Sequence, residues 1–167
     1  MAETIIGVTG HQEREGLDWE WTRTAVAKVL RDAQPVSWAL TSLAVGTDQL
    51  FAQEALDQAI DVRAIVPFAT YAHCFDGDGL ATYEALLAQC AEVEVLERRG
   101  SDKAAFLAAG KRVADECSLL IAVWDGEPAA GLGGTADIVE YAIARGRDII
   151  YLDPFARTTT TIRAKAT

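Results

Sequence analysis

Residues 118–142 read SLLIAVWDGEPAAGLGGTADIVEYA, and this stretch indicates the fold more clearly than any other in the chain. It begins with a short apolar run, Ser118–Trp124, of the kind that forms a strand buried on both faces of a sheet. A loop with four glycines follows, and from Thr135 onward apolar residues recur with the period of a helix. A buried strand that leads through a glycine-rich loop into a helix is typical of a parallel sheet covered by helices.

The same alternation of apolar runs and helical periods continues on both sides of this stretch. We therefore predict an α/β fold: a Rossmann-like, doubly wound, mostly parallel sheet of about six strands flanked by helices. Residues 1–153 would form a single Rossmann-like nucleotide-binding domain, and residues 154–167, which show no periodicity, an irregular C-terminal tail. The expected strands are Thr4–Val8, Val36–Leu43, Val62–Val66, Glu92–Leu96, Ser118–Trp124 and Asp148–Leu152.

The charge balance argues against some classes of partner. The 167 residues include 25 acidic and 15 basic ones, which gives a formal net charge of -10 and a pI near 4.6. Such a chain is expected to be repelled by phosphate backbones and anionic membranes, so we expect a small-molecule ligand, no nucleic acid and no membrane. No apolar run approaches the roughly 20 residues of a membrane span, and the N-terminus lacks the pattern of a signal peptide. We expect a cytoplasmic protein.

The cysteines and histidines predict no metal site. Cys74, Cys90 and Cys117 are widely spaced, and His11 and His73 lie in separate segments. Neither pattern matches a disulfide framework or a zinc site, and we expect three buried thiols, no protein-bound metal and no resident cofactor. A Mg²⁺ ion bound through the phosphates of a ligand would leave little trace in the sequence and stays open.

Ligands of a doubly wound sheet bind at the carboxyl ends of its strands, so the residues that follow each strand are the candidates for a site. Thr9, Gly10 and His11 follow the first expected strand, where they form a ligand contact or a tight turn with a surface histidine. After the second strand, Ser42, Gly46 and Asp48 precede a helix whose N-terminus is an expected anion site. Asp48 would either cap that helix or accept a hydrogen bond from a ribose hydroxyl.

The loop after the fifth expected strand is the richest of the three. Its glycines let the backbone approach a ligand, and Thr135 is placed to contact a phosphate oxygen. The loop matches neither the G-x-G-x-x-G dinucleotide motif nor the P-loop motif, which argues against NAD and ATPase functions. Tyr71, after Pro67 and Phe68, would either cover a base or pack in the core. The ligand-binding residues predicted in the glycine loop are Gly131, Gly133, Gly134 and Thr135.

Four motifs in this order resemble the SLOG superfamily of Rossmann-like proteins, which includes the LOG-type phosphoribohydrolases and the DNA-processing protein A family. The segment LAVGTD is similar to the L-A-x-G-x-D motif of the DNA-processing protein, and GLGGT is similar to the G-G-x-G-T motif of LOG enzymes. The resemblance spans about Ile5 to Asp153 and implies nucleotide-phosphate binding. The four segments are GVTGH (7–11), SLAVGTD (42–48), LLIAVWDG (119–126) and GLGGTADIVEYA (131–142).

One departure from the LOG pattern bears on activity. LOG enzymes carry a catalytic glutamate three residues after the threonine of the glycine motif, and Ile138 occupies that position here. We therefore predict a binding module or sensor for a nucleotide or ribose-phosphate derivative. The first alternative is a LOG-like phosphoribohydrolase that cleaves a nucleoside 5′-monophosphate to base and ribose 5-phosphate, with Glu140 or Asp125 as the catalytic carboxylate. The second is a protein-interaction module with a remnant site. The resemblance also implies a homodimer.

Overall fold

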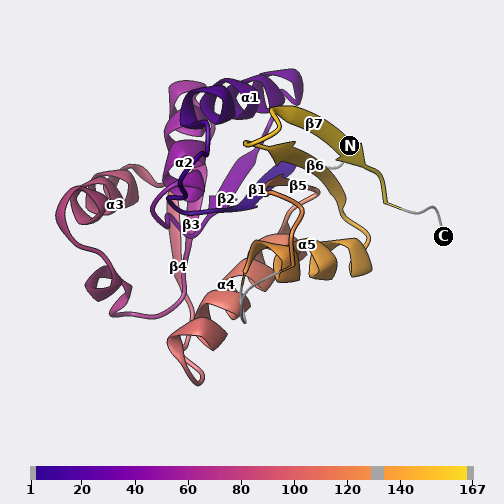
Figure 1. The fold of residues 1–167 in the computed structure, drawn as a ribbon. Coiled ribbons are helices and arrows are strands. Elements are labelled where there is room, and N and C mark those ends of the chain that lie inside the picture. Colours follow the sequence, from indigo (N-terminus) through magenta and orange to yellow (C-terminus); the bar gives the residue numbers. More distant parts are fainter. Residues whose placement is uncertain (1–2, 129–133, 165–167) are drawn as a thin grey trace.

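The computed structural model describes residues 3–128 and 134–164, which form an α/β structure around one seven-stranded sheet (Figure 1). The strand order is β4-β3-β2-β1-β5-β6-β7, with β1 to β6 parallel and β7 antiparallel to β6. The strands are β1 (Ile5–Gly10), β2 (Trp38–Thr41), β3 (Val62–Val66), β4 (Glu92–Val95), β5 (Leu119–Val123), β6 (Asp148–Asp153) and β7 (Thr158–Ile162). The helices are α1 (Trp19–Asp32), α2 (Thr47–Asp57), the 3₁₀ helix η1 (Tyr71–Cys74), α3 (Gly77–Gln89), α4 (Asp102–Glu116) and α5 (Thr135–Ala144).

The helices cover both faces of the sheet. Helices α1 and α2 pack together on one face and α4 and α5 on the other, while α3 lies beside α2 (Figure 1). The central strand β5 is apolar throughout because it is covered on both faces: Ile121 and Val123 pack in the α1–α2 layer, and Leu120 and Ala122 in the α4–α5 layer. The edge strand β4, by contrast, is largely exposed. The predicted fold class, a doubly wound and mostly parallel sheet, is confirmed.

Local signals explain how α1 forms. The Asp18 carboxylate caps its N-terminus by accepting a hydrogen bond of 2.9 Å from the N–H of Trp21. Thr22, Val26 and Leu30 are buried on one face of the helix, at the helical period that the sequence shows. The Asp18 cap also fixes where the preceding loop ends, and that loop contributes to the cavity described below.

The chain order places the carboxyl ends of β1 and β5 side by side at the centre of the sheet. From β1 the chain moves outward through β2 and β3 to β4, then crosses back to β5 on the other side of β1. Such a reversal of strand order opens a crevice at the carboxyl edge, which is where doubly wound proteins bind ligands.

The C-terminal segment differs from its prediction. Residues 154–167 were expected to form an irregular tail, but Thr158–Ile162 form the edge strand β7. This strand accounts for the difference between the predicted six strands and the observed seven. Its four threonines are exposed and show no apolar alternation, so it forms through its hydrogen bonds to β6 rather than through a buried face.

Two further findings concern the surface. Within residues 3–128 and 134–164, no helix is both long and apolar enough to span a bilayer. The expectation of three buried thiols is wrong for one of them, since Cys74 is exposed while Cys117 is buried and Cys90 is half-buried.

Candidate functional site

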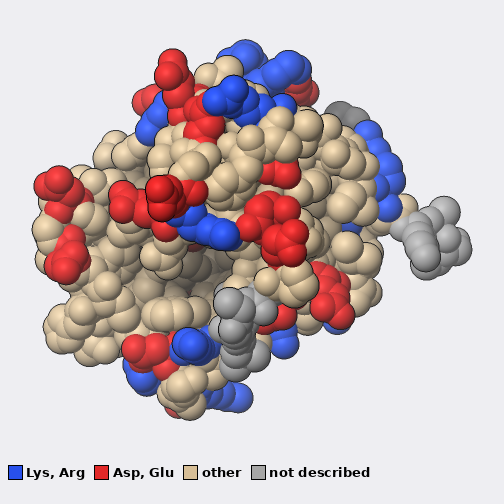
Figure 2. Space-filling view, in the orientation of Figure 1, with Lys and Arg blue, Asp and Glu red and all other residues tan. Residues whose placement is uncertain are grey.

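A cavity of about 920 Å³ lies at the carboxyl edge of the sheet, at the point where the strand order reverses. Figure 2 shows the corresponding hollow in the face of the molecule, with acidic and basic side chains around it. The loops that follow β1, β2, β3 and β5 contribute to its lining, as do α4 and the start of α5. The predicted site residues that line the cavity are Thr9, Gly10, His11, Ser42, Asp48, Asp125, Gly134 and Thr135.

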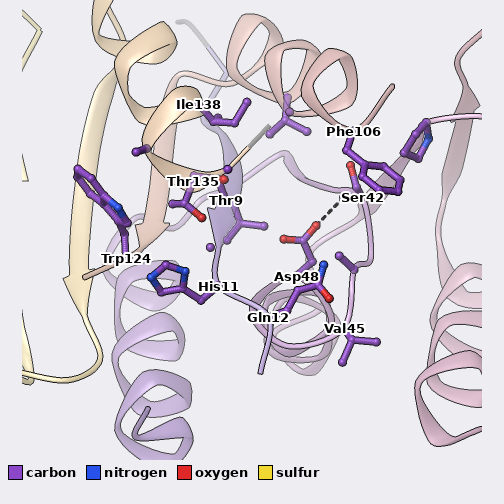
Figure 3. A pocket seen from close by; sticks show the side chains of 18 of the residues that line it. Thr9, His11, Gln12, Ser42, Val45, Asp48, Phe106, Trp124, Thr135 and Ile138 are labelled. Carbon is purple, nitrogen blue, oxygen red and sulfur yellow. Dashed lines mark hydrogen bonds between the residues drawn. The ribbon is translucent and has the colours of Figure 1, made fainter. Parts of the chain in front are cut away.

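The side chains of these residues approach the cavity from two sides. In Figure 3, Thr9, Thr135 and His11 lie on one side, and Asp48, Ser42 and Phe106 lie on the other. Residues from the β1 loop, the β2 loop and the start of α5 therefore face a common space, as their positions after the strands predicted.

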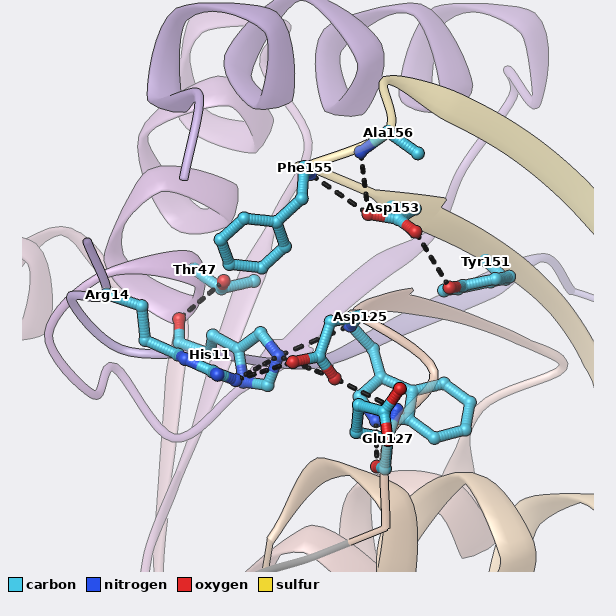
Figure 4. A network of polar contacts seen from close by, with 10 residues as sticks. His11, Arg14, Thr47, Asp125, Glu127, Tyr151, Asp153, Phe155 and Ala156 are labelled. Carbon is cyan, nitrogen blue, oxygen red and sulfur yellow. Dashed lines mark hydrogen bonds and ion pairs between the residues drawn. The ribbon is translucent and has the colours of Figure 1, made fainter. Parts of the chain in front are cut away.

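A cluster of three charged or titratable residues forms the polar wall (Figure 4). The Arg14 guanidinium donates a 2.8 Å hydrogen bond to the Asp125 carboxylate and lies 3.1 Å from Nε2 of His11. The backbone N–H of Asp125 also lies 3.3 Å from this Nε2, which acts as the acceptor. Arg14 is the one Lys or Arg among the lining residues that the structure describes.

This arrangement controls the charges of the polar wall. Burial and the Arg14 charge lower the pKa of His11, although Asp125 opposes them, so the imidazole is neutral at pH 7. Burial favours the protonated form of Asp125, but the Glu127 N–H, His11 and Arg14 together hold the pKa of Asp125 below its ordinary value. The wall thus presents one cation, one carboxylate already paired with it, and a neutral hydrogen-bonding ring.

The loop after β2 is shaped by Asp48. Its carboxylate accepts hydrogen bonds from the N–H groups of Ser42, at 3.1 Å, and Ala44. Burial outweighs these hydrogen bonds and raises the pKa of Asp48 to about 6. Within the same loop, Leu43 is fully buried with a φ of 59°, a strained conformation of the kind that clusters at functional sites.

Gly46 has a different role from the predicted one, because it does not line the cavity. It has a φ of 95°, and its backbone packs against the β1 loop. The N–H and the hydroxyl of Thr47 both donate to the carbonyl oxygen of His11, at 3.2 and 2.7 Å. At the start of α2, the N–H groups of Thr47 and Gln49 are therefore satisfied within the protein, the second by the carbonyl oxygen of Ala44 at 3.1 Å. The anion site expected at this helix start stays a prediction.

The start of α5 does face the cavity. Gly134, Thr135 and Ala136 line it, and no side chain caps the helix at Gly134. The predicted ligand residues Gly131 and Gly133 lie outside the described residues. Gly110 of α4 lets α4 and α5 pack closely, since a Cβ at residue 110 would come within 2.5 Å of the Ile138 side chain of α5.

An aromatic wall lies on the η1 and α4 side of the cavity. Tyr71, Phe75 and Phe106 line it together with Val45 and Pro67. Tyr71 contacts Phe75 edge to face with ring centroids 4.9 Å apart, and Phe106 lies 6.0 Å from Tyr71. Tyr71 is buried, in agreement with the core-packing alternative, whereas Phe106 has 36% of its surface exposed.

The two predicted catalytic carboxylates are placed differently. Glu140 is exposed on α5 and does not line the cavity, so it is not positioned to act on a ligand there. Asp125 lines the cavity, but it is paired with Arg14. Ile138, in the position of the LOG glutamate, lines the cavity with an apolar side chain.

Sequence reasoning missed Arg14 and Phe106. Arg14 belongs to an irregular segment between β1 and α1, and only its distance of four residues from Gly10 hinted at its place beside the site. Phe106 falls on the apolar stripe of α4, which predicts burial for a ring that is partly exposed at the cavity.

The comparisons with known proteins support the fold. No family model matches the chain, and no curated protein matches its sequence. The structure is similar to DNA processing protein A from Streptococcus pneumoniae, with a TM-score of 0.64 and 18% identity over 90% of this chain and 50% of that one. It is also similar to DNA processing protein A from Helicobacter pylori, with a TM-score of 0.61 and 15% identity over 90% of this chain and 65% of that one.

A third similar structure is the molybdenum cofactor binding protein from Rippkaea orientalis, with a TM-score of 0.58 and 19% identity over 91% of this chain and 77% of that one. Of the DNA processing protein A from S. pneumoniae, by contrast, the chain spans only about half the length. At this level of identity the likeness establishes the fold alone, and this is the Rossmann-like fold that the resemblance to the SLOG superfamily implied.

The expectation of no nucleic-acid partner is contradicted by the same comparison. The H. pylori protein, which shares this fold, has a single-stranded DNA binding mode. The expectation relied on net charge, which is a sum over the whole surface and does not describe a local patch. Arg98, Arg99 and Lys103 are close in sequence around the start of α4 and close in sequence to Phe106, which lines the cavity.

Proposed function

We propose that the chain binds a nucleotide or a ribose-phosphate derivative in this cavity and acts as a binding module or sensor. The observation that carries the proposal is that anion-binding groups and an aromatic wall line the same space of about 920 Å³. Small-molecule sites have this volume, and they combine apolar walls with a few placed polar groups.

The phosphate would lie between the polar wall and the start of α5. The N-terminal end of α5 carries the positive end of the helix dipole, and the Thr135 hydroxyl there faces the cavity. Arg14 adds a full positive charge. The neutral His11 ring adds no charge but can form a hydrogen bond with an anion.

The rest of the ligand would extend toward the opposite side. Asp48 faces the cavity and is placed to accept hydrogen bonds from the hydroxyl groups of a ribose. The exposed part of Phe106 offers a flat apolar surface on which a base can stack. This orientation uses the polar and aromatic walls at the same time.

The carboxylates favour binding over N-glycoside hydrolysis. A phosphoribohydrolase needs a carboxylate free to stabilise an oxocarbenium-like transition state or to activate water. Glu140 lies away from the cavity, and Asp125 is neutralised by Arg14 at 2.8 Å. We therefore expect no release of free base from nucleoside monophosphates, which chromatography of an overnight incubation checks.

A second candidate ligand is the end of a single-stranded nucleic acid. The observation in its favour is that Arg99 and Lys103 form no ion pair with any described residue and lie close in sequence to the exposed ring of Phe106. Cations beside an aromatic ring are the elements of a single-strand site, where bases stack and phosphates contact Lys or Arg.

Ligand binding is tested by native mass spectrometry of gently purified protein, followed by thermal-shift measurements with nucleoside mono-, di- and triphosphates, cyclic nucleotides and ADP-ribose. We expect a ligand-dependent increase in Tm that Thr135→Val abolishes and Thr135→Ser, which keeps the hydroxyl, retains. The absence of both a co-purified nucleotide and a Tm shift across the panel would overturn the proposal.

A further inference from the structure

The turn of the C-terminal hairpin of β6 and β7 lies beside the polar wall of the cavity, where Phe155 contacts Arg14 and His11 (Figure 4). The turn between the two strands is fixed by Asp153, whose carboxylate accepts hydrogen bonds from the N–H groups of Phe155, at 2.9 Å, and Ala156, at 3.0 Å. The N–H of Arg157 donates to the Asp153 carbonyl oxygen at 2.8 Å. A turn with its donors satisfied in this way holds the Phe155 backbone in one position.

The same turn is joined to the loop between β1 and α1. The N–H of Asp18 donates to the carbonyl oxygen of Pro154 at 3.2 Å, and Nε of Arg157 lies 2.8 Å from the Asp18 carboxylate. These contacts join segments that are more than 130 residues apart in sequence, and they hold the end of the loop at Asp18 against the hairpin. Arg14 belongs to the loop.

The Phe155 ring covers the polar wall from outside. The Arg14 guanidinium lies over the ring, 5.6 Å from its centroid, and the His11 ring meets it edge-on at 6.3 Å. The Arg14 side chain is 49% exposed, so without this contact many rotamers would be open to it. Phe155 from outside and Asp125 from the cavity side together restrict the guanidinium to one orientation.

We propose that Phe155 is a positioning residue, which holds Arg14 over the cavity and thereby sets the preference of the site for phosphorylated over unphosphorylated ligands. This inference rests on the proposed function, because it assigns the phosphate to Arg14. It gives the C-terminal hairpin a part in recognition, although Phe155 itself does not line the cavity.

The test compares AMP with adenosine, two probes that differ by the phosphate alone, in isothermal titrations of the full chain. Phe155→Leu keeps the apolar bulk but removes the π face, and Phe155→Tyr keeps the ring. We expect Phe155→Leu to weaken AMP binding by roughly two- to fivefold and to leave adenosine binding unchanged. Phe155→Tyr is expected to bind both probes as the natural chain does. Equal losses for both probes, or no loss, would overturn the inference.

A second measurement needs no ligand and keeps the two proposals distinguishable. The chain has two histidines, so NMR can follow the His11 ring with pH and use the exposed His73 as an internal reference. Burial and, after it, the Arg14 charge lower the pKa of His11, while Asp125 and Asp153 raise it. If Phe155→Leu releases Arg14, the pKa of His11 rises more in the natural chain than in an Arg14→Gln background, where only the burial by the Phe155 ring is lost. Equal changes in the two backgrounds contradict the inference. A natural chain that binds neither probe would instead count against the proposed function.

Discussion

Gly46 and Gln12 lie so close together that a Cβ atom on residue 46 would come within 2.8 Å of the Gln12 Cα atom. The carbonyl oxygen of His11 is also only 3.0 Å from that position, and Gly46 has a φ of 95°. We expect Gly46→Ala to destabilise the fold by about 2–4 kcal/mol, because the new methyl group meets backbone atoms in a conformation that alanine disfavours. Chemical denaturation measures this change.

Gly146 provides the matched control. It also has a positive φ, of 75°, but a Cβ there would meet no atom within 4 Å. Gly146→Ala is therefore expected to lower the free energy of unfolding by about 1 kcal/mol, because alanine disfavours the positive φ and meets no other obstacle. Equal losses in the two variants would show that the close contact between the β1 and β2 loops contributes nothing beyond the backbone conformation.

Arg14 and Arg99 distinguish the two candidate ligands. Because Arg14 is the described cation that lines the cavity, Arg14→Gln is expected to raise the Kd for AMP by about tenfold. Arg99→Gln should leave AMP binding unchanged and weaken binding of a short single-stranded oligonucleotide, with a smaller dependence of Kd on salt. Fluorescence anisotropy and titration calorimetry at several salt concentrations measure both. Loss of both ligands in the same variant would mean that they share one anion site.

The strands could be predicted from the sequence wherever burial alone decides the structure. Leu119–Val123 is apolar throughout because helices cover both of its faces, and this pattern is visible without a structure. Thr158–Ile162 has no such pattern, since its stability comes from pairing with β6. Helix α3 carries glycines in its first turn, and what defines it is the burial of Tyr83 and Leu86 in a cluster that only the folded chain brings together.

Site residues were predictable where position after a strand decides the outcome. Thr9 lies at the carboxyl end of β1, and Asp48 and Thr135 lie in the first turns of the helices that follow β2 and β5. The carboxyl ends of parallel strands necessarily meet at one edge of the sheet, where all three residues line the cavity. Arg14 could not be found in this way, because its place depends on Asp125 and Phe155, which are distant in sequence. A tertiary contact of this kind leaves no local pattern in the sequence.

Asp48 is expected to lower stability at neutral pH. Its pKa is about 6 in the folded chain against 3.8 when unperturbed, so the folded state holds a proton that the unfolded state has released between these values. Stability from this group is therefore greatest below about pH 4 and falls as the pH rises through 6. We expect Asp48→Asn to be more stable by about 1–3 kcal/mol at pH 7.5, with the difference vanishing near pH 4.

Denaturation at several pH values checks this prediction. Asp57→Asn, at an exposed position of the same helix, controls for the loss of one negative charge from α2. A stability gain that does not depend on pH would contradict the assignment to Asp48. If Asp48 also accepts hydrogen bonds from a ribose, the stabilised variant should bind AMP more weakly, which would explain why a destabilising carboxylate lies in the cavity.

Cys74 offers a reporter for the aromatic end of the cavity. It is exposed and lines the cavity beside Phe75 and Phe106, whereas Cys117 is buried and Cys90 is half-buried. Burial raises the pKa of both Cys90 and Cys117 to about 11, which keeps them protonated as well as shielded. We expect a chromogenic aromatic disulfide to label one thiol of the native chain rapidly and three after denaturation.

A ligand whose base stacks on Phe106 should slow this labelling in proportion to occupancy, because it covers the Cys74 sulfur. Partial desolvation and the nearby Asp102 carboxylate raise the pKa of Cys74, so the rate should also increase with pH up to and beyond 9. Cys74→Ser is the control and should lack the fast phase. If saturating nucleotide protects the thiol while ribose 5-phosphate does not, the base lies at the aromatic wall. Equal protection by both would mean that the ribose or the phosphate, and not the base, covers Cys74, and protection by neither would place the ligand elsewhere in the cavity.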